Sequence, residues 1–411
     1  MLMIQEFKKI WKSYFIGLLW LLGLLWPLLG IHPDGTLSFG RTMTVWLYIA
    51  AGSSICLLLY ITNKSGMLKP IADPVSAARG KIAIWSGALP AWIWIPLLLA
   101  FAFLFPVIFT SRYAQDVAIN VLIYICLGLG LNIVVGLAGM LDLGYIAFYG
   151  VGAYTYALLN VNYGLSFWVC LPAAAFSSCL AGCIIGYPTL KMRGDYLAIV
   201  TLGFGEIVRI ILNNWMTLTN GPNGVLGVKV PAIYIPSFAD GFSFELFYLK
   251  KLYYLYYVAL ALAIVTIICV HRLNFSRIGR AWESIREDET AAGLMGVNAF
   301  RLKLLAYAMG AIFAGLAGAF FSARMRFVSP ESFTFLESAM VLCMVVLGGM
   351  GSIPGIILGA AALIVLPEVF REFELYRMLA FGATMTLMML FRPAGLIPAK
   401  RMGTRSEEKE G

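Results

Sequence analysis

Three ionisable residues lie inside otherwise apolar stretches and are the first candidates for chemistry: Asp142, Glu206 and Arg209. A charge is costly in hydrocarbon, so such residues usually face protein or a water-filled path. Glu206 and Arg209 have the i, i+3 spacing that lets two side chains pair on one helix face. Two roles are open for this pair, a neutralised pair that fixes helix packing and a polar element beside a transport path. For Asp142 we expect a local structural role or a helix cap.

Residues that carry catalysis or hold metals are otherwise scarce. The chain has 2 His and 7 Cys, and the Cys residues lie in apolar runs without a C-x-x-C pair. We therefore predict no metal site and no acid–base or nucleophilic centre, which argues against a membrane enzyme. The phosphate-binding pattern G-x-x-x-x-G-K-[ST] does not occur either, so ATP hydrolysis is not assigned to this chain.

The elements that must position these residues are membrane helices. Of 411 residues, 61% are hydrophobic and 12% charged, whereas a soluble protein carries about 25% charged residues. Since one span takes about 20 apolar residues, the composition predicts an all-α polytopic membrane protein with roughly 10–12 membrane segments, some of them short or broken. The apolar runs lie at 14–31, 43–61, 82–109, 117–137, 140–159, 165–187, 196–213, 252–271, 304–323, 338–347, 354–370 and 377–391.

Glycines predict how two parts of this bundle are built. The stretch 338–370 is interrupted by Gly-Gly-Met-Gly-Ser at 348–352, so we expect two helical pieces that meet near one membrane surface. Gly182 and Gly186, like Gly351, Gly355 and Gly359, have the four-residue spacing of tightly packed membrane helices.

The distribution of charge predicts the orientation in the membrane. If the N-terminus is cytoplasmic and the spans alternate, the segments 1–13, 62–81, 188–195, 271–303 and 392–411 share the cytoplasmic side. They hold most of the 30 Lys and Arg residues, while the 21 Asp and Glu residues divide almost evenly. Cytoplasmic loops are enriched in Lys and Arg, so both termini are expected in the cytoplasm. The net charge of +9 then reflects orientation and not nucleic-acid binding.

A change of composition near residue 110 predicts three parts. Residues 1–110 are rich in Trp and Leu and are expected to form an N-terminal membrane extension with a basic cytoplasmic loop at 62–81. Residues 111–399, dense in small residues, are expected to form the core, and 400–411 a cytoplasmic tail.

The cytoplasmic segment 271–303 is the most informative polar stretch. It is helix-forming and charged, and residues such as Trp282 and Ile285 give it a partly apolar side. Acidic residues nearly balance the basic ones, whereas a loop that binds anionic membrane lipid would be more one-sided in charge. The pattern favours a helix docked in a groove of a protein partner.

Several motifs resemble known permeases. Thr290-Ala291-Ala292-x-x-x-Gly296 resembles the E-A-A-x-x-x-G loop of ABC-importer permeases, with Thr290 in place of the first Glu, although the usual I-x-L-P does not follow. Longer motifs resemble the LivM family of high-affinity branched-chain amino acid importers, in matching order from Asp116 to Ile397. They are GDYLAIVTLGFGEIVR at 194–209, GPNG at 221–224, GRA at 279–281 with REDE at 286–289, VSPESF at 328–333, LGGMGS at 347–352 and RPAGL at 392–396.

This resemblance implies a permease subunit of an ABC importer in the bacterial inner membrane, translocating leucine, isoleucine and valine. A periplasmic binding protein would deliver the amino acid, a LivH-like second permease would complete the path, and two cytoplasmic ATPase subunits would use ATP. No cofactor is expected on this chain. Residues 271–303 would form the ATPase-coupling segment, with these residues as candidates: Arg280, Glu283, Arg286, Asp288, Glu289, Ala291, Ala292 and Gly296.

Some alternatives stay open. A urea permease of the same family shares the motifs, although the N-terminal extension favours amino acids. An ion-coupled secondary transporter would need a coupling carboxylate near the membrane midplane, and only Glu206, with Arg209 nearby, is available. The outer loops 213–251 and 324–337 are expected either to receive the binding protein or to form a folded cap over the helix ends.

Overall fold

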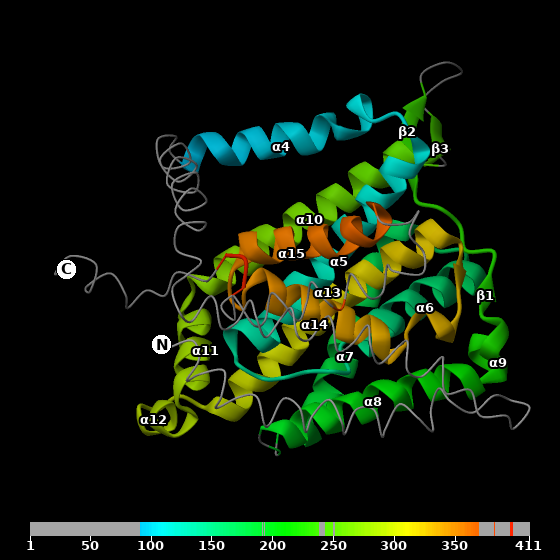
Figure 1. The fold of residues 1–411 in the computed structure, drawn as a ribbon. Helices are drawn as coiled ribbons and strands as arrows, with labels where there is room; N and C mark the ends of the chain where they lie inside the picture. The colour runs from blue at the N-terminus through cyan, green and yellow to red at the C-terminus, as the bar shows by residue number, and fades with distance from the viewer. Residues whose placement is uncertain are drawn as a thin grey trace, which may run out of the picture. The chain divides into compact units, whose positions relative to one another are not determined.

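The computed structural model describes residues 91–190, 192, 194–237, 243–249, 251–369, 382 and 395–397, which are mainly helical (Figure 1). The chain divides into two compact units, Met1–Ala100 and Phe101–Gly411. The predictions for 14–31, 43–61, 62–81 and 400–411, and for 377–391 apart from Gly382, fall outside the described residues.

Helices account for almost all of the described second unit, and the predicted all-α membrane class is confirmed. Six helical stretches in the described residues are long and apolar enough to cross a membrane: Arg112–Leu137, Phe167–Thr189, Tyr196–Asn214, Leu252–Asn274, Ala299–Met325 and Pro330–Gly348. The α-helices are α4 (Ala91–Ile108), α5 (Arg112–Asn132), α6 (Ile146–Tyr163), α7 (Phe167–Thr189), α8 (Asp195–Asn214), α9 (Met216–Thr219), α10 (Leu252–Asn274), α11 (Arg277–Glu287), α12 (Glu289–Leu294), α13 (Ala299–Met325), α14 (Phe335–Gly348) and α15 (Ile353–Val369).

The prediction of a span over 140–159 is wrong at its start. Residues 138–145 form a non-helical connection, and α6 begins only at Ile146. Gly139 has a φ of +72° there, which ends regular helix. Much of the connection is buried inside the bundle, since Met140 is 4% exposed and Tyr145 is fully buried, whereas Leu141 is 42% exposed. Composition alone does not separate such a buried connection from a membrane helix.

Helix α13 is the centre of the bundle and packs against α5, α6 and α7 (yellow in Figure 1). Small residues allow this close packing, since a Cβ added to Gly182 of α7 would lie 2.8 Å from Cβ of Ala311 on α13. Close approach between helix backbones is the main use of small residues in membrane bundles.

The broken stretch 338–370 folds as the sequence predicts, into α14 and α15. Both Gly349 and Gly351 have positive φ in the turn, and Ser352 N donates to Gly349 O at 3.0 Å. A Cβ at Gly359 would lie 2.6 Å from Met344 O, so the two pieces pack backbone to backbone. Both also pack against α5.

Two small antiparallel sheets, which the sequence analysis does not predict, lie at one end of the bundle (Figure 1). Strand β1 (Val225–Leu226) pairs with β4 (Phe327–Val328), and β2 (Ala232–Ser237) pairs with β3 (Ser243–Tyr248). The β1–β4 pair joins 213–251 to 324–337, the two loops predicted on the same membrane side. Helices α11 and α12 lie at the opposite end (Figure 1). This arrangement agrees with the predicted alternation of the spans.

Candidate functional site

Helices α11 and α12 form a compact corner between α10 and α13. Ser276 caps α11, since Gly279 N donates to its Oγ at 3.1 Å. Asp288 ends α11 and caps α12, because Thr290 N and Ala291 N donate to its Oδ1 at 2.8 and 3.1 Å. The hydrogen bonds from Ala291 and Thr290 hold the pKa of the Asp288 carboxyl below its ordinary value. Local hydrogen bonds therefore fix the corner between the two helices.

Two contacts fasten this corner to the start of α13. Trp282 is fully buried, and its Nε1 donates to Leu302 O at 2.7 Å. Glu289 Oε2 lies 2.7 Å from Lys303 Nζ. These two contacts therefore join α11 and α12 to α13, the central helix of the bundle.

Arg286 is half-buried and reaches across to the end of the helix that begins as α5. Its Nη1 donates to the carbonyl of Gly136, at the end of the helix that begins as α5. Its aliphatic part lies against Gly139, where an added Cβ would lie 2.6 Å from Arg286 Cγ. The guanidinium therefore serves a contact within this chain.

The remaining candidates of the coupling segment divide by exposure. Arg280, Asp288, Ala291 and Gly296 are exposed, Glu283 is half-buried and Ala292 is buried. Gly296 has a φ of +87° in the turn that follows α12.

Beside Ala291 lie two large apolar side chains that are not among the candidate residues predicted from the sequence: Leu294 is 88% and Met295 85% exposed. We define the α12 tip as Ala291, Leu294 and Met295.

Glu206 and Arg209 form the ion pair that their spacing permits, near the middle of α8. Arg209 Nε donates to Glu206 Oε2 at 2.8 Å. The Glu206 side chain is 31% exposed and the Arg209 side chain 34%. Ile199 and Ile210 of the same helix are also exposed. The pair therefore lies on a helix that keeps much of its surface open in the single chain.

Asp142 lies in the buried connection between α5 and α6. Its Oδ1 accepts a hydrogen bond from Gly144 N at 2.9 Å, and Leu143 N donates to Thr201 Oγ1 of α8 at 3.1 Å. Asp142 thus shapes a turn that docks on α8. In the described residues no group of three or more His, Cys, Asp or Glu is arranged to hold a metal ion.

Comparison with known proteins identifies the family. A family model described as "Branched-chain amino acid transport system / permease component" matches residues 113–391. The chain belongs to this permease family. The match runs from the second residue of α5 through α15, so the corner formed by α11 and α12 and the α8 ion pair both lie within it.

Two relatives of this permease are similar over most of its length. The LivM permease proteins of the high-affinity branched-chain amino acid transport systems of Salmonella typhimurium and Escherichia coli are each 45% identical, over 370 and 371 residues, or 87% of this chain and 86% of each relative. The Salmonella typhimurium LivH permease protein is 25% identical over 67% of this chain and 91% of its own length. No solved structure matches the chain. The predicted family is thus confirmed.

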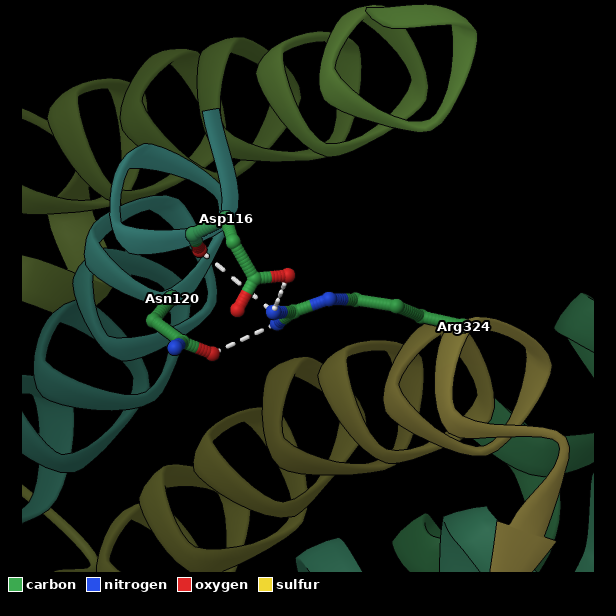
Figure 2. A network of polar contacts seen from close by, with 3 residues as sticks. All are labelled: Asp116, Asn120 and Arg324. Carbon is green, nitrogen blue, oxygen red and sulfur yellow. Dashed lines mark hydrogen bonds and ion pairs between the residues drawn. The ribbon is translucent and has the colours of Figure 1, made fainter. Parts of the chain in front are cut away.

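The permease also has a polar cluster that sequence reasoning missed, between the start of α5 and the end of α13 (Figure 2). Arg324 of α13 donates to Asp116 Oδ1 at 2.6 Å and to Asn120 Oδ1, both on α5. One turn further along α5, Tyr124 donates to the carboxylate of Glu337 on α14. The four-residue spacing of Asp116, Asn120 and Tyr124 at the start of an apolar run is the signal that predicts this stripe. The stripe joins α5 to α13 and α14.

Proposed function

We propose that this permease is the membrane-spanning subunit of an ABC importer that translocates leucine, isoleucine and valine, and that separate ATPase subunits drive it through α11 and α12. The α12 tip carries the proposal. It exposes Leu294 and Met295 outside the membrane-spanning helices, on a corner that hydrogen bonds hold in place. Such an apolar group rimmed by charges is typical of a protein-binding surface.

The contacts of the corner supply a mechanical route for this drive. Trp282 and the Glu289–Lys303 pair fasten α11 and α12 to α13. Closure of an ATPase dimer against the α12 tip would then move α10 and α13 as rigid bodies, which is a common form of transport switching. Arg280, exposed on α11, adds a charge to the same docking surface.

For orientation, we propose that the end with α11 and α12 faces the cytoplasm and that the end with the two small sheets faces the periplasm. Lys and Arg gather in the segments 188–195 and 271–303 at the first end, in keeping with the positive-inside rule. Both chain termini are then cytoplasmic, in the bacterial inner membrane. The loops 213–251 and 324–337, joined by β1 and β4, would receive the periplasmic binding protein.

For the path, we propose that the α8 face with Glu206 and Arg209 meets a LivH-like second permease and lines the route between them. Both side chains are about one-third exposed in the single chain, near mid-helix, where direct contact with lipid would be costly. A branched-chain amino acid has a charged head and an apolar tail. A few polar groups on apolar walls suit its passage, while selectivity is left to the binding protein.

The experiment is reconstitution of this permease in proteoliposomes with a LivH-like permease, two ATPase subunits and candidate binding proteins. Leucine with its binding protein should stimulate ATP hydrolysis and uptake, and urea with a urea-binding protein should not. Stimulation by urea alone would assign the chain to a different substrate.

A further inference from the structure

We propose that Arg286 is a positioning residue that transmits the movement of α11 and α12 to the end of α5, and from there to α8 and to the α14–α15 turn. The proposal rests on the proposed function, because it takes the ATPase subunits as the source of that movement. It assigns Arg286 to coupling inside the permease and not to the surface that binds the ATPase subunits.

Arg286 packs closely against the end of the helix that begins as α5. The guanidinium donates to Gly136 O, while the side-chain stem fills the space that a Cβ at Gly139 would take. Gly139 has a φ of +72°, a backbone conformation that other residues rarely adopt. In this proposal, a displacement of α11 moves the end of α5 through this contact.

The end of α5 that receives Arg286 is not a regular α-helix. Residues Ile133–Leu137 form a π-helical turn, in which Ala138 N donates to Ile133 O at 3.1 Å, and Met140 N then donates to Val134 O at 3.0 Å. Such turns are rare and occur frequently at functional sites. A shift of the hydrogen bonds by one residue would convert the turn to α-helix and displace the connection that follows, which makes this turn a suitable two-state element.

The π-helical turn lies between two other segments of the permease, the α14–α15 turn and the connection that packs on α8. On one side Asn132 Oδ1 accepts from Gly351 N at 2.8 Å, so the turn between α14 and α15 is seated on it. A Cβ at Gly136 would lie 2.7 Å from the same Gly351 nitrogen. Arg286 and the α14–α15 turn thus contact the same turn of helix.

On the other side, the connection after the π-helical turn is docked on α8. Leu143 N donates to Thr201 Oγ1, and an added Cβ at Gly205 would lie 3.0 Å from Cα of Gly144. Thr201 and Gly205 precede Glu206 on α8. The contacts therefore run from α11 through Arg286 and the α5–α6 connection to the helix that carries the charged pair.

Two buried polar groups in the described part of this junction have hydrogen-bonding capacity that the present arrangement does not use. In the described part of the chain, Asn132 Nδ2 and Asp142 Oδ2 are buried without a hydrogen-bond partner. Buried polar groups in proteins nearly always have partners, so a pair of unused ones in a single junction is unusual. They are available for new hydrogen bonds when the junction rearranges.

The test uses the complete importer in proteoliposomes and measures three quantities: co-purification of the ATPase subunits, ATP hydrolysis, and leucine uptake per ATP hydrolysed. Arg286→Met should keep the ATPase subunits bound and hydrolysis active, while uptake per ATP falls about tenfold, since a hydrogen bond from a charged group is lost. Arg286→Lys should recover part of the ratio. Arg277→Met, a matched loss of charge in the exposed first turn of α11, should leave all three quantities unchanged.

A second variant tests the same contact from the other side. Gly139→Ala keeps the arginine in the sequence, but its methyl group would lie 2.6 Å from Arg286 Cγ at a backbone φ of +72°, so the contact must shift. This variant should lower uptake per ATP in the same way. An unchanged ratio in both Arg286→Met and Gly139→Ala would overturn the proposal, as would loss of the ATPase subunits from Arg286→Met. If the ATPase subunits never bind the unaltered permease, the proposed function itself fails, which is a different result.

Discussion

Nη2 of Arg324 lies 2.6 Å from Oδ1 of Asp116, and this ion pair joins the end of α13 to the start of α5 (Figure 2). The Arg324 side chain is 6% exposed, and that of Asp116 is 51% exposed. The arginine is buried, and its charge is balanced by a carboxylate that is half in solvent. The pair therefore joins the two helices at the end opposite α11 and α12.

Asp116→Ala should destabilise the permease by about 1–2 kcal/mol, because it leaves the buried Arg324 with Asn120 and a backbone carbonyl as remaining partners. The measurement is the thermal unfolding midpoint in detergent. Arg112→Met, which removes an exposed charge from the first turn of the same helix, should leave the midpoint unchanged. Equal midpoints for Asp116→Ala and the unaltered protein would contradict the fastening role.

Leu294→Asp should abolish recovery of the ATPase subunits while leaving the amount of permease in the membrane unchanged. The side chain is 88% exposed, so the folded chain tolerates a charge there, but an apolar groove of a partner does not. Leu226→Asp provides the control, since Leu226 is 66% exposed at the opposite end of the bundle. Normal ATPase recovery with Leu294→Asp would remove the α12 tip from the docking surface.

Asp288→Ala should weaken ATPase binding, whereas Asp288→Asn should retain most of it, because the Asn side chain still accepts hydrogen bonds from the first turn of α12. The pKa of Asp288 is lowered in the folded chain, so the carboxylate's contribution is complete above its ordinary pKa and is lost only as the pH falls through the lowered value. Binding measured between about pH 5 and 8 should therefore show no step from this group. A step in that window that disappears in Asp288→Asn would contradict this assignment.

The charge swap Glu206→Arg with Arg209→Glu distinguishes the two roles of the α8 pair. Each single substitution should lower the membrane level of the assembled permeases, because it leaves an unpaired charge near mid-helix. The swap should restore assembly but not leucine uptake, since the order of charges along the path is reversed. Full recovery of uptake by the swap would reduce the pair to a helix-packing element.

The sequence predicts those features that depend on local pattern. Apolar length gives the membrane helices α5, α7, α8, α10 and α13, and the glycines at 348–352 give the break between α14 and α15. The pairing of Glu206 with Arg209 follows from their spacing on one helix. In each case residues that are close in sequence are also close in space, so the local sequence is enough to predict the structure.

Features made by distant segments escape sequence reasoning. Arg286 is chosen as a coupling residue from its place in a charged segment, but nothing in that segment tells that it contacts Gly136. Residues 140–145 of the connection are read as part of a span, because burial by other helices makes the connection as apolar as a span. The pairing of β1 with β4 and the Asp116–Arg324 ion pair likewise depend on how α5, α6 and α13 pack.

Concentrative leucine uptake by proteoliposomes tests whether separate ATPase subunits drive this permease. The proteoliposomes contain the permease, a LivH-like permease and a binding protein, with and without the ATPase subunits. Uptake should require both ATP and the ATPase subunits, and Leu294→Asp should abolish it. Concentrative uptake by the permease without ATPase subunits, driven by an ion gradient alone, would contradict this role of the ATPase subunits.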